Sequence, residues 1–171
     1  MNLADLITPD AIRCNIEVNS KKRALEVLAD LLTTSTSSEP ANSEQSNSED
    51  KPEDPAFQVF QLLIDREKLG STGMGHGIAL PHARTNTTNK ASAAFIKLEK
   101  GIDFDSPDQQ PTDLIFALLV PEHDTEQHLQ ILSHLASLFS NDTFCQHLRT
   151  ATTTDELYKH LTHNILSSKA S

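Results

Sequence analysis

The sequence predicts a single α/β domain. Strand-like and helix-like patterns mix along the chain, without the strict alternation of strand and helix that marks a doubly wound fold. The continuous apolar run Leu114–Val120 is typical of a central strand buried on both faces. A chain of 171 residues can bury one substantial core. We therefore expect one domain over residues 1–171, interrupted by a polar insert at about residues 33–54.

The N-terminal part predicts a turn, a strand and a helix. Asn2–Pro9 has the pattern of a short helical turn that ends at a proline. Apolar and polar residues alternate with a period of two from Ile12 to Val18, which indicates a half-buried strand. Asn19 or Ser20 can cap the helix that follows, which we expect to end at Leu32.

The insert differs from the rest of the chain in composition. It is rich in Ser, Thr, Glu and Asn, and its six acidic residues and one lysine between Glu39 and Asp54 give a net charge of −5, half of the chain's formal charge of −10. Such a segment buries too little apolar surface to offset the entropy of ordering it. We expect a disordered surface insert between two helices, with a phosphorylated regulatory segment as the alternative.

The middle of the chain predicts a helix followed by three strands. Asp54 before Pro55 is a favourable helix start, and this helix should end near Leu69. The expected strands cover residues 78–80, which Pro81 terminates, 92–98 and 114–120, with a short edge piece at 101–105. The inner side of the helix is predicted to consist of Phe57, Phe60, Leu63 and Ile64.

Three helices are expected in the C-terminal part. Asp124 and Gln127 have the spacing of a capping box, as do Thr153 and Glu156. A shorter helix should lie between them at about residues 143–149, and the last helix should run to about Leu166 before the tail frays. The apolar side of the first of these helices is predicted to be Leu129, Leu132, Leu135, Leu138 and Phe139, with His128 on or beside it.

Composition excludes several classes of function. The net negative charge argues against a nucleic-acid partner. Cys14 and Cys145 are far apart and form no CxxC pair, which indicates a reducing compartment rather than a disulfide framework or a zinc ribbon. No apolar run approaches the ~20 residues of a membrane span, and the N-terminus lacks the pattern of a signal peptide. We expect a cytoplasmic protein without membrane insertion.

One stretch has the composition of a phosphate site. Four of the five glycines lie between Gly70 and Gly77, where loop N–H groups can bind anionic oxygens. Arg66 and Arg84 flank this loop, and arginine binds phosphate in a bidentate manner. The Gly-Lys-Ser/Thr ending of a P-loop is missing, which argues against a nucleotide.

His82 is the candidate reactive group of this stretch. It follows Pro81, and we expect it at the C-terminal end of a strand, where ligands of open α/β sheets usually bind. A neutral imidazole is a nucleophile, so a histidine beside an anion-binding loop indicates a phosphohistidine. The alternative is a glycine-rich turn with an incidental histidine.

The motifs around His82 resemble those of a known family. Arg66-Glu67, Leu69–Thr72, Gly75–Gly77 and Leu80-Pro81-His82 resemble the signature of enzyme IIA domains of the bacterial phosphoenolpyruvate-dependent phosphotransferase system (PTS), of the mannitol/fructose/nitrogen type (EIIA type 2). The stretches 104–108, 111–121 and 127–129 resemble the nitrogen-regulatory branch of that family, IIA-Ntr or PtsN, in particular. The resemblance covers nearly the whole chain apart from the insert.

This resemblance implies a fold and a function. The fold would be an α/β sandwich with a central mixed β-sheet flanked by helices, whose strand order the sequence leaves open. The protein would be a phosphocarrier and regulator in signal transduction rather than a free-standing enzyme. An HPr-like or NPr-like phosphocarrier protein would phosphorylate His82, and target proteins such as potassium-transport or sensor-kinase proteins would respond to the phosphorylation state.

The resemblance also implies roles for site residues. His128 would assist His82, and no metal or other cofactor would be required. The groups expected around the phosphate are Arg66, Ser71, Thr72, Gly73, Gly75 and His76.

Three other functions are considered. A sugar-specific IIA component would pass the phosphate to a IIB domain for uptake of fructose or mannitol. A metal hydrolase could use His76, His82 and His128, although the chain has no HExxH motif. A binding module with a silent phosphosite is disfavoured because no candidate reacting group is missing.

Overall fold

The computed structural model describes residues 3–36 and 54–168. Most of the polar insert therefore lies outside the described residues, as does the end of the C-terminal tail. The first residues of the insert, 33–36, belong to the helix before it, which runs past the predicted end at Leu32.

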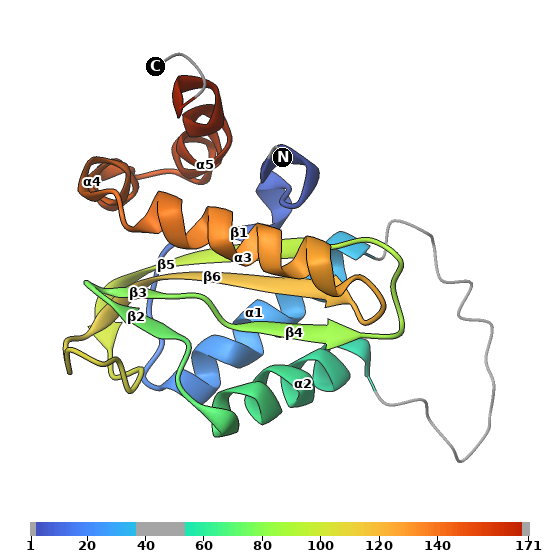
Figure 1. The fold of residues 1–171 in the computed structure, drawn as a ribbon. Coiled ribbons are helices and arrows are strands. Elements are labelled where there is room, and N and C mark those ends of the chain that lie inside the picture. Colours follow the sequence, from blue (N-terminus) through green and yellow to red (C-terminus); the bar gives the residue numbers. More distant parts are fainter. Residues whose placement is uncertain (1–2, 37–53, 169–171) are drawn as a thin grey trace.

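The centre of the molecule is a six-stranded mixed sheet (Figure 1). The strand order is β1-β5-β6-β3-β2, and β4 also pairs with β6. β1 is parallel to β5, β3 and β4 are parallel to β6, and the β5/β6 and β2/β3 pairs are antiparallel. The strands are β1 (Ile12–Ile16), β2 (Gly73–Gly75), β3 (Ile78–Ala79), β4 (His82–Thr85), β5 (Ser92–Ile102) and β6 (Thr112–Pro121).

Within the described residues five α-helices flank this sheet, which confirms the predicted fold class. α1 and α2 cover one face, and α3, α4 and α5 lie on the other (Figure 1). Two short 3-10 helices, η1 and η2, precede β1. The helices are η1 (Leu3–Asp5), η2 (Pro9–Ala11), α1 (Lys21–Thr36), α2 (Pro55–Leu69), α3 (Thr125–Phe139), α4 (Asp142–Thr150) and α5 (Thr154–Ser168).

The predicted helix starts are confirmed by their capping hydrogen bonds. Of the two candidates before α1, Ser20 is the residue whose hydroxyl accepts from the Arg23 N–H, at 3.1 Å. The carboxylates of Asp54 and Asp124 accept from backbone N–H groups in the first turns of α2 and α3. The Thr153 hydroxyl accepts from the Glu156 N–H at the start of α5. Each side chain satisfies a helix N–H that has no partner within its helix.

The predicted buried sides of α2 and α3 are wrong in part. α2 buries Val59, Leu63 and Glu67, whereas the side chain of Phe57 is 50% exposed. α3 buries His128, Ile131, Leu135 and Phe139, while Leu129 is 60% exposed. In both helices a polar residue occupies the buried face. His128 was predicted on or beside that face of α3, which its burial confirms. Glu67 of α2 was not predicted, because a search for apolar periodicity does not select a carboxylate.

Two strand predictions are also corrected. β5 continues to Ile102 and includes part of the predicted edge piece. Pro81 does not leave His82 at the end of a strand, because His82 is the first residue of β4. Pro81 has no N–H to donate, so the ladder is interrupted there. Its carbonyl still accepts from the Leu118 N–H, and pairing with β6 resumes at His82.

The glycine-rich stretch forms a β-hairpin rather than an open loop. β2 and β3 pair antiparallel across the turn Gly75–Gly77. Gly75 and Gly77 have φ angles of 85° and 82°, and His76 between them has 57°. These are left-handed conformations that glycine adopts at little cost. No helix among residues 3–36 and 54–168 is long and apolar enough to cross a membrane.

Candidate functional site

Three elements bring the candidate residues together around one cavity. His82 and Arg84 share one side of β4, because successive side chains of a strand alternate in direction. α2 contributes Arg66 from its last turn, and α3 contributes His128 from its first turn. These four side chains line a cavity of about 360 Å³, together with Leu62, Asp65, Leu69 and Ala83.

The nucleophilic nitrogen of His82 follows from one hydrogen bond. The Nδ1 of His82 lies 2.9 Å from the carbonyl oxygen of Leu80, which can only accept, so Nδ1 carries the proton. The lone pair of the neutral ring is then on Nε2. Partial burial lowers the pKa of His82 below its ordinary value, and the Arg66 and Arg84 charges act in the same direction. His82 is therefore neutral, and nucleophilic at Nε2, near neutral pH.

His128 lies against His82 and is almost fully buried. Its side chain is 4% exposed, and the two rings meet edge to face with their centroids 5.4 Å apart. The guanidinium Nε of Arg84 donates to His128 Nδ1 at 3.3 Å. Burial, with smaller contributions from His82 and Arg84, lowers the pKa of His128 to about 4. The ring of His128 is thus neutral beside that of His82.

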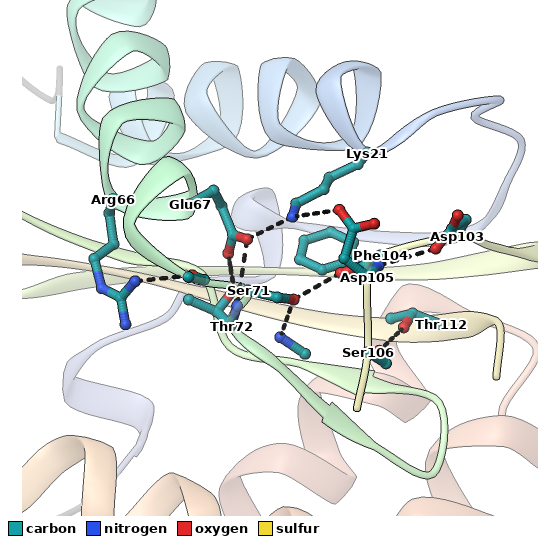
Figure 2. Close-up of polar contacts among 12 residues, drawn as sticks. Lys21, Arg66, Glu67, Ser71, Thr72, Asp103, Phe104, Asp105, Ser106 and Thr112 are labelled. Carbon is teal, nitrogen blue, oxygen red and sulfur yellow. Dashed lines mark hydrogen bonds and ion pairs between the residues drawn. The ribbon is translucent and has the colours of Figure 1, made fainter. Parts of the chain in front are cut away.

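Arg66 is held at the cavity by the segment that follows α2. Its guanidinium Nη1 donates to the carbonyl oxygen of Gly70 at 3.0 Å (Figure 2). The guanidinium retains further N–H donors that this contact does not use. Arg66 therefore places a positive charge and free donors at the rim of the cavity.

The residue after Arg66 anchors the same segment from the other side. The buried carboxylate of Glu67 accepts from both the N–H and the hydroxyl of Thr72. It also pairs with Lys21 Nζ at 2.7 Å, and Lys21 contacts Asp105 at 3.2 Å (Figure 2). The Glu67 carboxylate thereby joins α1, α2 and the segment 70–73, and Lys21 connects them to the 103–111 loop. We refer to Lys21, Glu67, Thr72 and Asp105 as the Glu67 network.

The hydroxyl groups predicted to bind phosphate make internal contacts. Ser71 donates its hydroxyl to the Phe104 carbonyl at 2.7 Å and accepts from the Gly73 N–H, whereas Thr72 bonds to Glu67 (Figure 2). Ser71, Thr72, Gly73 and Gly75 do not line the His82 cavity. A direct role for these four residues in phosphate binding stays a prediction, and their observed contacts hold the chain between α2 and β3.

His76 lies away from the cavity. Its side chain is exposed at the β2–β3 turn. Its N–H donates to Asp108 at 2.8 Å, and its carbonyl accepts from Arg149, which also forms two hydrogen bonds to Asp113. Within the described ranges no group of three His, Cys, Asp or Glu side chains could hold a metal ion, so the three-histidine site is not assembled. The role of His76 in phosphate binding stays a prediction.

Several residues of the site were not identified from the sequence. Leu62 and Leu69 line the cavity from α2, four positions before and three positions after Arg66, and Asp65 lines it from the position next to Arg66. Helical spacing counted from Arg66 would have found Leu62 and Leu69, because residues three and four apart share a helix face. The bond from Arg84 to His128 had no sequence signal, because it joins residues 44 positions apart.

Comparison with known proteins identifies the family. The family model described as "Phosphoenolpyruvate-dependent sugar phosphotransferase system, EIIA 2" matches residues 5–164. The chain belongs to the PTS EIIA type 2 family. It is thus a PTS IIA component, as the motifs around His82 predicted.

Individual members of the EIIA type 2 family add detail. A nitrogen regulatory protein of Escherichia coli (strain K12) is 37% identical over 163 residues, which cover 95% of this chain and 90% of the relative. The crystal structure of the nitrogen regulatory protein IIA-Ntr from Neisseria meningitidis is 38% identical with a TM-score of 0.78, over 94% of this chain and 99% of that one. These relatives confirm the resemblance to the nitrogen-regulatory branch.

A more distant EIIA type 2 structure confirms the fold alone. It is enzyme IIA mannitol of Escherichia coli in complex with phosphorylated enzyme IIB mannitol. It is 20% identical with a TM-score of 0.67, over 91% of this chain and 98% of that one.

Proposed function

We propose that this protein carries a phosphoryl group on Nε2 of His82 and regulates target proteins through the presence or absence of that group. The observation that supports this proposal is the Nδ1–H hydrogen bond from His82 to Leu80, in a cavity shared with Arg66, Arg84 and His128. This hydrogen bond leaves Nε2 of His82 as the nucleophilic nitrogen, in a cavity that the cationic Arg66 and Arg84 also line. Membership in the EIIA type 2 family gives independent support.

The proposed reaction is an in-line transfer from a phosphohistidine of a small phosphocarrier protein. The bond from phosphorus to the donor nitrogen breaks as the bond to His82 Nε2 forms, and the electron pair of the broken bond stays on the donor ring. The His82 ring gains positive charge as its lone pair is shared. The Leu80 carbonyl, bound to Nδ1–H, stabilises that charge. Most of the catalysis in such transfers comes from positioning and charge stabilisation.

The cavity supplies groups for the phosphoryl oxygens. Arg66 and Arg84 are the cationic residues that line it. In the proposal Arg66 turns its unused N–H groups toward the oxygens, and the His128 ring, 5.4 Å from that of His82, donates one hydrogen bond. His128 assists but does not become phosphorylated, because its ring is buried and leaves no room for an attacking partner.

We propose regulation of target proteins as the output. The nitrogen regulatory proteins that match almost the whole chain are 37% and 38% identical to it, against 20% for enzyme IIA mannitol. Potassium-transport and sensor-kinase proteins are the target classes we expect, and the cytoplasm is the location we expect. The second candidate is transfer onward to a IIB domain, which the mannitol complex supports for a protein of the same fold.

A phosphorelay with purified phosphoenolpyruvate-linked donor proteins tests the phosphosite. The wild type should become labelled, His82→Ala should not, and His128→Ala should be labelled more slowly. Phosphohistidine is stable at alkaline pH and labile in acid. Mass spectrometry of a product kept at alkaline pH should therefore locate the phosphate on His82. Phosphate on His128 or His76 with His82 unmodified would reverse the assigned roles.

A pull-down with each phospho-form distinguishes the two outputs. A regulator should retain a target protein preferentially in one phosphorylation state. A sugar-type component should instead lose its label when a fructose-type or mannitol-type IIB domain is added. Loss of label to the IIB domain, with the same proteins retained by both forms, would favour the second candidate.

A further inference from the structure

The two ring nitrogens of His128 have opposite environments. Nδ1 lies 3.3 Å from the Nε of Arg84, and a guanidinium N–H can only donate. Nδ1 must therefore offer its lone pair. Nε2 is buried and has no hydrogen-bond partner in the described part of the chain. Because a neutral imidazole carries one proton, that proton is on Nε2.

This arrangement is costly in the unphosphorylated protein. A buried donor without an acceptor loses its hydration and gains nothing in return. The charged ring, with protons on both nitrogens, is also excluded, because its Nδ1 proton would face the Arg84 donor. The low pKa of His128 agrees with a ring that stays neutral. A buried N–H that is unpaired beside His82 is the donor that a phosphoryl oxygen on His82 would satisfy.

We propose that Arg84 is a positioning residue that fixes His128 in the tautomer with the proton on Nε2. Arg84 acts through His128, because its Nε is used on that ring. Its place on β4, two residues after His82, puts both side chains on one side of the strand. β4 therefore positions both His82, the nucleophile, and Arg84, which orients His128. The benefit to phosphotransfer rests on the proposed function, whereas the tautomer does not depend on it.

The test reads the tautomer directly in the unphosphorylated protein. Protein with ¹⁵N-labelled histidine is studied by two-dimensional NMR that correlates ring nitrogens with ring carbon-bound protons, a pattern that differs between the two tautomers. The His128 signals are assigned by their loss in His128→Gln. The wild type should show protonated Nε2 and unprotonated Nδ1. Arg84→Met, which keeps the length of the side chain and removes its donors, should shift His128 toward a mixture of tautomers.

Two further variants serve as rescue and control. Arg84→Lys retains a charged donor and should restore the Nε2–H tautomer at least in part. Arg23→Met removes an exposed arginine that pairs with Glu26, and should leave the His128 signals unchanged. A wild-type His128 with the proton on Nδ1 would overturn the proposal. So would an Arg84→Met protein, folded by its amide spectrum, with an unchanged tautomer. If Arg84→Met does not fold, the same comparison is made with Arg84→Leu, which also lacks a side-chain donor.

A second readout tests the functional consequence. In Arg84→Met the Nε2–H of His128 should no longer be fixed as a donor to the charged phosphoryl group. The loss of one such hydrogen bond should slow labelling of His82 by about tenfold. Arg84→Lys should lie between Arg84→Met and the wild type. An altered tautomer with an unaltered labelling rate would show that Arg84 has no part in the reaction. Failure of all variants and of the wild type to accept phosphate would contradict the proposed function, while the NMR result would still decide the tautomer.

Discussion

Each ring nitrogen in the cavity is distinguished by its neighbour. His82 Nδ1 donates to a carbonyl, and His128 Nδ1 accepts from a guanidinium. The consequence is that the two rings carry their protons on different nitrogens. A nucleophilic Nε2 on His82 then lies beside a ring whose Nε2 carries a proton. Two histidines of the same chemistry are thereby suited to different tasks.

Arg66 can be tested at the level of the single residue. Arg66→Ala should slow phosphotransfer to His82 by about 10²-fold, because a donor that stabilises developing charge is lost. Arg66→Lys should recover part of the rate, since an ammonium cannot bind two oxygens in the bidentate geometry of a guanidinium. Single-turnover labelling with a purified phosphocarrier measures both rates, and thermal unfolding checks that the variants are folded. Equal rates for wild type and Arg66→Ala would refute the assignment.

His128 should make stability depend on pH. Its pKa is about 4 in the folded protein, against about 6.5 in an unfolded chain. Between these values the unfolded chain binds more protons, so acidification lowers the free energy of unfolding over that window. His128→Gln does not titrate and should show a weaker dependence between about pH 6.5 and about pH 4. Urea unfolding across the window measures this, with His123→Gln, at an exposed histidine, as the control. Parallel curves for wild type and His128→Gln would contradict the shifted pKa.

At the scale of elements, the end of α2 is held by the Glu67 network. Arg66 bonds to the carbonyl of Gly70, while Glu67 binds Thr72 on the same segment. The last turn of the helix and the chain after it are thus fixed at two adjacent positions. Lys21 extends this connection to α1 and the 103–111 loop. The position of Arg66 at the cavity therefore depends on contacts made outside it.

Glu67→Gln tests the Glu67 network. The amide places an NH₂ group against the Thr72 or Lys21 donors and removes the partner charge of Lys21. The free energy of unfolding should fall by about 1–3 kcal/mol, the cost of leaving buried polar groups unpaired. Glu26→Gln, in the exposed pair with Arg23, should change it by less than about 0.5 kcal/mol. Chemical denaturation measures both, and similar values would show that the buried carboxylate is not special.

Gly77 in the hairpin turn and Gly70 at the end of α2 have different steric surroundings. A Cβ at Gly77 would lie 2.5 Å from the Arg149 Nη2 and 2.7 Å from the Asp113 Oδ1, on a backbone with φ of 82°. Gly77→Ala should therefore cost about 1–3 kcal/mol of stability. Gly70→Ala is the matched control, because nothing lies within 4 Å of its Cβ and its φ of 160° is extended. Urea midpoints compare the two, and a Gly77→Ala protein as stable as Gly70→Ala would refute the argument.

The elements also show which features a sequence can predict. Helix starts depend on residues a few positions apart, so the caps at Ser20, Asp54 and Asp124 were recognisable. The buried side of α2 depends in part on a partner distant in sequence. Glu67 is buried because Lys21 of α1 pairs with it, and no local pattern predicts that contact.

At the scale of the whole molecule, β6 sets the position of the site. β3 and β4 both pair with it, and Pro81 between them interrupts the ladder. The chain from Ile78 to Thr85 thus pairs with β6 through two short strands, β3 and β4, and His82 is the first residue of β4. The apolar run of β6 predicted a central strand. Its neighbours could not be predicted, because pairing is decided by contacts between segments that are distant in sequence.

The polar insert offers a test at the same scale. Residues 37–51, which lie outside the described residues, are rich in acidic and small polar side chains. This composition predicts that they add little to stability. Replacing them with a short Gly-Ser linker should change the melting temperature by no more than a few degrees, because loop-closure entropy varies slowly with length.

The phosphorylation rate of His82 should also stay within about twofold, since the residues that line its cavity lie between Leu62 and His128. The replaced residues carry four acidic side chains and one lysine, −3 of the formal charge of −10, so mobility in native gels should fall and confirm the replacement. A large loss of melting temperature would show that the segment packs on the domain, and slower phosphorylation alone would show that it takes part in docking the donor.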